Sequence, residues 1–185
     1  DVNCAPMFNS IIGDVIVKNV SVTCPAGYCE VHVASESLRS LLIDNVGITN
    51  KTNGHQYILI EKPVERLAVQ NISKSVDNTT TGQIIANVTS TATINSLSIS
   101  SISVRNAATK YINSVLSVAC PVTSLEVSGF LIENEAYTTS SNALLKCWSG
   151  ANVASLILAN GTAKATKYLF EITSGVTLGN VVFNG

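Results

Sequence analysis

A short aliphatic pattern recurs six times along the chain and constrains the fold more than any other feature of the sequence. Each copy places aliphatic residues at its first, fourth and sixth positions. The copies are Ile12, Val15 and Val17; Leu38, Leu41 and Ile43; Val64, Leu67 and Val69; Ile94, Leu97 and Ile99; Val122, Leu125 and Val127; and Val153, Leu156 and Leu158. Central residues of successive copies are 26 to 31 residues apart. A regular period of this length indicates a structural repeat.

Each copy is followed by a position that interrupts the aliphatic pattern. Four residues after the central aliphatic stand Asn19, Asn45, Asn71, Ser101, Gly129 and Asn160. These residue types adopt left-handed or bridge conformations at low cost. One residue later the apolar pattern resumes with Val20, Val46, Ile72, Ile102 and Phe130, although the sixth copy has Gly161 there. The pattern therefore predicts two short strands that meet at a corner.

A further β-like segment lies about 17 residues after each central aliphatic. These segments are Val31 to Val33, Tyr57 to Ile60, Ile84 to Val88, Val115 to Val118, Leu144 to Cys147 and Tyr168 to Ile172. The lengths between copies vary in polar stretches, where loops can lengthen without disturbing a repeat. Three strands and three turns per period predict a parallel β-helix, in which each strand pairs with its equivalents in the neighbouring rungs.

These repeats resemble the right-handed parallel β-helix fold of pectate lyases, phage tailspikes and secreted adhesins. The resemblance covers Ile12 to Gly185 and implies a solenoid of about six to seven rungs. Residues 1–11 are then an N-terminal cap or docking arm, and residues 12–185 are one solenoid domain. Two alternatives stay open, a β-sandwich and a leucine-rich horseshoe, although the ninth position of the horseshoe signature lacks its asparagine. The resemblance implies a fold, not an activity.

Composition excludes several classes of function. Only 12% of the 185 residues are charged, with 11 basic and 12 acidic side chains, so a surface for nucleic acid is not expected. No apolar run reaches 18 residues, so membrane insertion is not expected either. The chain begins at Asp1 without a basic and apolar leader, and we interpret it as a processed protein or an excised piece.

The five cysteines favour an oxidising, extracellular compartment such as a cell or virion surface. Cys24 and Cys29 in the string CPAGYC suit a small disulfide loop better than a metal knuckle, with free thiols as the alternative. Cys120 and Cys147 fall near the ends of equivalent strands, and we expect a second disulfide there. Cys4 is then unpaired or bonded to another chain.

Six sequons for N-glycosylation are weak support for a secreted glycoprotein, because about four are expected by chance in a chain so rich in Asn, Ser and Thr. They begin at Asn19, Asn50, Asn71, Asn78, Asn87 and Asn160. Asn19, Asn71 and Asn160 share the predicted corner, where a glycan meets no strand.

The sequence contains no motif that predicts catalysis, a metal site or a cofactor. The nearest acidic pair, Glu133 and Glu135, is interpreted as part of a solvated loop. His32 and His55 each lack a second ligand at metal-binding spacing. The alternative is a fragment of a polysaccharide-processing enzyme, a lyase or glycoside hydrolase, whose catalytic residues lie outside this chain.

Two groups of apolar residues suggest contact surfaces. Ile16, Leu42 and Ile157 fall on the outward side of the predicted strands, where loops or a partner would cover them. Val182 and Phe183 lie in a strand-like C-terminal segment, and Cys4 and Phe8 lie in the predicted arm. We therefore expect a non-enzymatic structural or adhesive module, with partners that are other copies, the rest of a longer chain, or surface carbohydrate.

Overall fold

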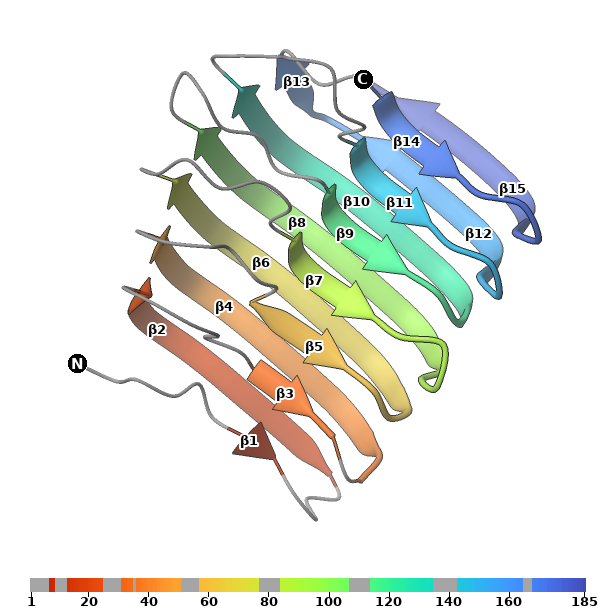
Figure 1. Ribbon diagram of the computed structural model, residues 1–185, viewed down its shortest axis with the longest axis horizontal. Coiled ribbons are helices and arrows are strands. Elements are labelled where there is room, and N and C mark those ends of the chain that lie inside the picture. Colours follow the sequence, from red (N-terminus) through yellow and green to blue (C-terminus); the bar gives the residue numbers. More distant parts are fainter. Residues whose placement is uncertain are drawn as a thin grey trace.

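The chain folds into two parallel β-sheets that enclose one apolar core (Figure 1). The computed structural model describes residues 7–8, 13–24, 31–34, 36–50, 57–76, 84–106, 114–134, 143–164 and 168–185. Every strand pair within these ranges is parallel, and the strands stack as a β-solenoid. The predicted parallel β-helix is confirmed, and the β-sandwich alternative is wrong because its sheets would be antiparallel.

Short strands form one sheet, called here the short sheet. In spatial order they are β1 (Met7–Phe8), β3 (Val31–Val33), β5 (Ile58–Ile60), β7 (Ile84–Val88), β9 (Ser114–Val118), β11 (Ala143–Cys147) and β14 (Tyr168–Ile172). The edge strand β1 comes from the segment predicted as a cap or arm, and it pairs with β3 as an ordinary member of the sheet.

Longer strands form the second sheet, called here the long sheet. Its order is β2 (Asp14–Cys24), β4 (Leu38–Asn50), β6 (Val64–Val76), β8 (Ile94–Asn106), β10 (Pro121–Asn134), β12 (Asn152–Ala159) and β15 (Thr177–Asn184). Strand β13 (Thr162–Lys164) lies beyond the corner that follows β12 and pairs with β10.

The register of the long sheet places equivalent residues of the repeat directly opposite one another. The central column consists of Val15, Leu41, Leu67, Leu97, Leu125, Leu156 and Val181. From Leu41 to Leu156 its side chains are at most 1% exposed, whereas Ser96 and Ser124 on the preceding outward position are exposed. Alternation along the strand therefore directs the central aliphatic residues from Leu41 to Leu156 into the core.

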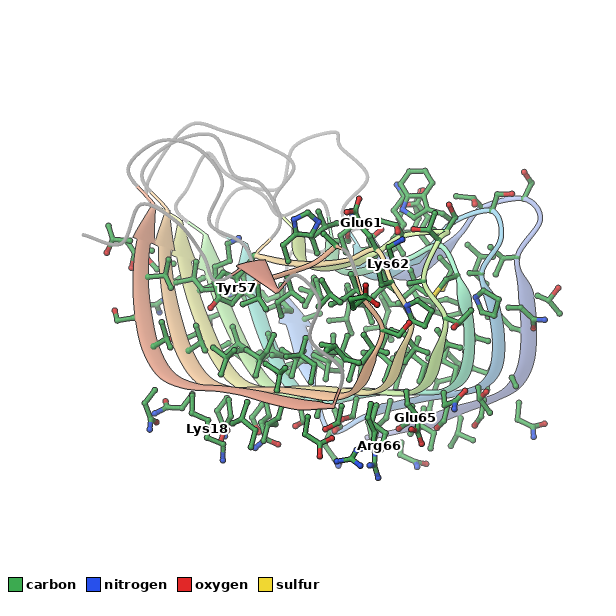
Figure 2. The ribbon with its side chains drawn as sticks, turned by 90° about the horizontal axis from the view of Figure 1, so that it is seen from below. Lys18, Tyr57, Glu61, Lys62, Glu65 and Arg66 are labelled. Carbon is green, nitrogen blue, oxygen red and sulfur yellow. The ribbon has the colours of Figure 1, made fainter. Side chains whose placement is uncertain are left out.

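Each long strand bends at the position that interrupts the aliphatic pattern. Asn19, Asn45, Asn71, Ser101, Gly129 and Asn160 have φ between 52° and 61°. The residue with positive φ bends the strand, so its two halves cover two sides of the core (Figure 2). The short sheet covers the remaining side. The Asn45 Nδ2 amide donates a hydrogen bond to Asn19 Oδ1 at 2.8 Å, which links the corners of neighbouring rungs.

Two residues, Gly161 and Lys74, depart from the apolar columns after the corner, and packing explains the first of them. A Cβ atom at Gly161 would lie 2.3 Å from ring carbons of Phe130, so the Phe130 ring already fills the space that a side chain would need. Large and small residues thus compensate between neighbouring rungs. The other departure, Lys74, is 2% exposed and occupies the column between Ile48 and Val104.

The central column predicts a large difference between neighbouring positions of β8. Leu97→Ala should lower the free energy of unfolding by about 2 to 5 kcal/mol, because it leaves a cavity in a packed core. Ser96→Ala, on the exposed side of the same strand, should change it by no more than about 0.5 kcal/mol. Urea denaturation followed by circular dichroism measures both, and equal losses would contradict the assigned inward face.

The corner predicts a stabilising substitution. Ser101→Gly should raise the free energy of unfolding by up to about 1 kcal/mol, because a Cβ atom is unfavourable at positive φ and the neighbouring corner already carries Gly129. Ser103→Gly, two residues further along β8, should instead lower it by about 0.5 to 1 kcal/mol. Thermal melts of both variants check the sign, and destabilisation by Ser101→Gly would contradict the corner's role.

Candidate functional site: the C-terminal end of the solenoid

The last rung leaves core positions of the repeat open to solvent. In the central column, Leu156 of β12 is fully buried, but Val181 of β15 is 37% exposed. In the next inward column, Leu158 is 3% exposed and its neighbour Phe183 is 54% exposed. These side chains point the same way as the buried ones before them, but no described strand pairs with β15 on its outer side.

Further apolar side chains extend this surface onto the short sheet. The large exposed apolar residues of the last rung are Tyr168, Leu169, Ile172, Val181, Val182 and Phe183. Phe170 of β14 and Phe183 of β15 pack against each other, with ring centroids 5.7 Å apart and planes inclined by 36°. The two sheets therefore meet at an aromatic contact on the uncovered end.

An open hollow of about 510 Å³ lies beside Phe183. Its apolar lining includes Phe130, Leu158, Ala163 and Leu169. Strand β13 borders it and pairs only with β10 among the described strands. In the preceding rungs, the second half of a long strand occupies the equivalent place.

The outward apolar residues differ in exposure along the molecule. Ile16 is 64% exposed and Val182 is 41% exposed, whereas Leu42 and Ile157 are half-buried. The register puts all four in one column of the long sheet. Ala68, Ser98 and Glu126 fill the middle of that column, so its apolar character is confined to the two ends.

Charged side chains gather on the outer face of the first rungs, as Figure 2 shows for Lys18, Glu65 and Arg66. Arg39 and Ser40 both donate hydrogen bonds to Asp14, the latter at 2.6 Å, and together they hold the pKa of the Asp14 carboxyl well below its usual range. Because these groups are exposed, water and salt screen the interaction, and we assign it no large contribution to stability.

A second carboxyl on this face lies close to the corner. Asn71 Nδ2 donates to Asp44 Oδ1 at 2.8 Å, and Lys18 Nζ lies 3.5 Å from Asp44 Oδ2. The Asn71 hydrogen bond, followed by those from Gln70 and Lys18, lowers the pKa of Asp44. The contacts join neighbouring rungs, with Lys18 on β2, Asp44 on β4 and Asn71 on β6.

The outer column of the short sheet carries two polar clusters. His32 Nε2 lies 2.6 Å from Glu61 Oε2, and Glu61 projects on the side of the molecule opposite Arg66 (Figure 2). Further along, Lys146 Nζ lies 3.1 Å from Glu171 Oε2 and 4.3 Å from the Trp148 ring centroid. Trp148 Nε1 also donates to Ser117 Oγ at 2.8 Å.

These pairs were not predicted, because the short strands carry no periodic signal that fixes their register. Each cluster joins one carboxylate to one basic group, Glu61 to His32 and Glu171 to Lys146. Among the described residues, no three His, Cys, Asp or Glu side chains lie close enough to hold a metal ion. The interpretation of Glu133 as a loop residue is wrong, because it lies half-buried in β10, where Arg105 Nε donates a hydrogen bond to its Oε2 at 3.3 Å. Glu135 and His55 lie outside the described residues.

The predicted disulfide between Cys120 and Cys147 is wrong, because both residues are buried free thiols. The register places Cys147 opposite Val118, two residues before Cys120. Cys120 instead lies in the corner between β9 and β10. Burial raises the pKa of the Cys120 thiol to about 12 and that of Cys147 to about 11. The predicted pairing of Cys24 with Cys29 falls outside the described side chains, as does Cys4.

The predicted glycosylation positions occupy different surroundings. Asn19, Asn71 and Asn160 are exposed at the corner with positive φ, and Asn87 is half-buried in β7. The side chain of Asn50 and the whole of Asn78 lie outside the described residues. The corner sequons therefore have the exposure that a glycan needs.

Comparison with known proteins leaves the chain without a relative from which a function could be carried over. No protein-family model, curated protein or solved structure matches it. Across the described ranges, no helix has both the length and the apolar character required to span a bilayer. The function must be argued from the exposed end of the solenoid itself.

The buried thiols predict strong protection from alkylation. At pH 8 in the folded protein, Cys120 and Cys147 should react with iodoacetamide at least about 100-fold more slowly than after denaturation, since the raised pKa removes the reactive thiolate. Peptide mapping of labelled protein, folded and unfolded, measures each site. A Cys120–Cys147 disulfide, or equal labelling in both states, would contradict the structure.

Proposed function

We propose that this chain is a non-enzymatic structural or adhesive module of an extracellular surface, a virion or a filament, and that it works by joining its C-terminal end to another polypeptide. The observation that carries the proposal is the exposure of Val181 and Phe183, which belong to columns buried in every preceding rung from β4 to β12. Burial of such side chains removes apolar area from water and favours association.

The edge of the last rung lacks the features that usually prevent strand pairing. Strand β15 has the sequence TLGNVVFN, without a charged residue or a proline. Natural sheet edges are commonly blunted by charge, by proline or by a covering element. An apolar end with an unblunted strand therefore favours the addition of another strand.

The extracellular part of the proposal is supported by composition. A weakly charged chain rich in Ser, Thr and Asn, with five cysteines and six sequons, suits secreted proteins better than cytosolic ones. Three of the sequons lie at exposed corners, where attached glycans would not obstruct the stacking of rungs. Surface carbohydrate is a further partner class for such a module.

Assembly tests the proposal. The wild-type protein should scatter light with a mass several-fold above the 19.4 kDa of one chain at micromolar concentration. Phe183→Glu should return the mass to that of one chain, because it places a charge in the apolar contact. Ser124→Glu, on the exposed middle of the long sheet, is the matched control and should assemble like wild type. Reductant is included so that no disulfide through Cys4 can join chains.

Two results would count against the proposal. A wild-type protein that stays a single chain at all concentrations would remove its main support. Release of reducing ends or unsaturated sugars from a polysaccharide panel would favour the enzyme alternative instead. Both experiments use the same preparation.

A further inference from the structure

We infer that the polypeptide covering the C-terminal end is a second copy of this chain, whose β2 extends the long sheet from β15 in parallel register. The inference rests on the proposed function, because it names the partner of the same surface. It follows from a comparison of the first and last rungs, whose open edges have complementary side chains.

Both ends of the solenoid present a strand with one open edge. Among the described strands, β2 pairs only with β4, and β15 pairs only with β12. The short sheet repeats this arrangement, since β1 pairs only with β3 and β14 only with β11. All pairs run parallel, so the first rung of a second copy can stack on the last rung in the orientation that every internal rung already uses.

Continuation of the internal register aligns core positions across the junction. Val15 would lie opposite Val181 in the central column, and Val17 would lie opposite Phe183 in the next. Val17 is only half-buried, whereas its neighbour Ile43 is fully buried, and Phe183 is 54% exposed. The contact would therefore remove apolar area on both sides from water. In the short sheet, Phe8 takes the register position opposite Ile172, which is 44% exposed.

The outward apolar column supports a head-to-tail arrangement in particular. Its apolar residues stand at the two ends of the chain, with Ile16 and Leu42 at one end and Ile157 and Val182 at the other. Head-to-tail stacking brings the four together as one stripe across the junction. Tail-to-tail pairing of two β15 strands would leave Ile16 exposed in water.

The polar positions at the junction contain no like charges. Asp14 would face Asn180, and Lys18 would face Asn184. Strand β15 contributes no charge of its own, so the carboxyl of Asp14 and the ammonium of Lys18 meet neutral amides that can hydrogen-bond to them. Electrostatics therefore do not oppose the contact.

A contact between different ends of identical chains does not close, and it generates a filament. Seven stacked rungs at about 4.8 Å each give an axial repeat of roughly 34 Å per copy.

Charge complementation tests the partner and the orientation together. Val182→Glu should reduce the light-scattering mass to that of one chain, and so should Ile16→Lys. The double variant Ile16→Lys with Val182→Glu should assemble again, because each junction then pairs the new lysine with the new glutamate. High salt should weaken this rescue, since it screens the pair. Circular dichroism confirms that the exposed substitutions leave the fold intact.

A mixture of the Val182→Glu and Val182→Lys proteins tests tail-to-tail pairing, in which two β15 strands face each other. If the mixture assembles and the double variant does not, two β15 strands pair with each other, and the head-to-tail inference is overturned while the proposed function stands. If Val182→Glu assembles like wild type, the second copy does not dock on this edge. A wild-type chain that never associates overturns the proposed function as well.

Discussion

Parallel, in-register pairing of each rung with the next is the interaction on which the structure depends. It forces residues 25 to 31 positions apart into shared columns, so each column must keep its character from rung to rung. The aliphatic column from Leu41 to Leu156 meets this requirement and is buried throughout. Burial of this column ends where stacking ends, and most of the large exposed apolar side chains described here belong to the first or the last rung.

Much of this architecture could be predicted because in-register pairing requires the same kind of residue at equivalent positions of successive rungs. A strand that turns a corner once per rung needs a residue tolerant of positive φ at the same place, and Asn45, Asn71 and Ser101 stand there. For Val182 and Phe183 the sequence predicted only a strand-like segment, and the register of β12 with β15 is what places Val181 and Phe183 in the core columns. Their exposure required the structure, because it depends on what lies beyond β15.

Other features could not be predicted because they depend on corner lengths and side-chain reach. The corner between β9 and β10 has two residues and the equivalent corner after β11 has four, and this difference accompanies the offset between Cys120 and Cys147 that excludes their disulfide. Gly161 interrupts its apolar column because the Phe130 ring of the neighbouring rung fills the space that a side chain would need. The pair between His32 and Glu61 joins a strand to a turn in the next rung, beyond any periodic signal.

Hydrogen exchange of the backbone amides of β15 tests the central claim, that this edge is a docking surface for another strand, most directly. As protein concentration rises, the alternate amides between Val181 and Asn184 that point to the open edge should become protected, because a newly paired strand would accept their hydrogen bonds. The amides of β8, already paired on both sides, should exchange at an unchanged rate. Exchange in β15 that stays equally fast at every concentration, in a sample that light scattering shows to be assembled, would contradict the claim.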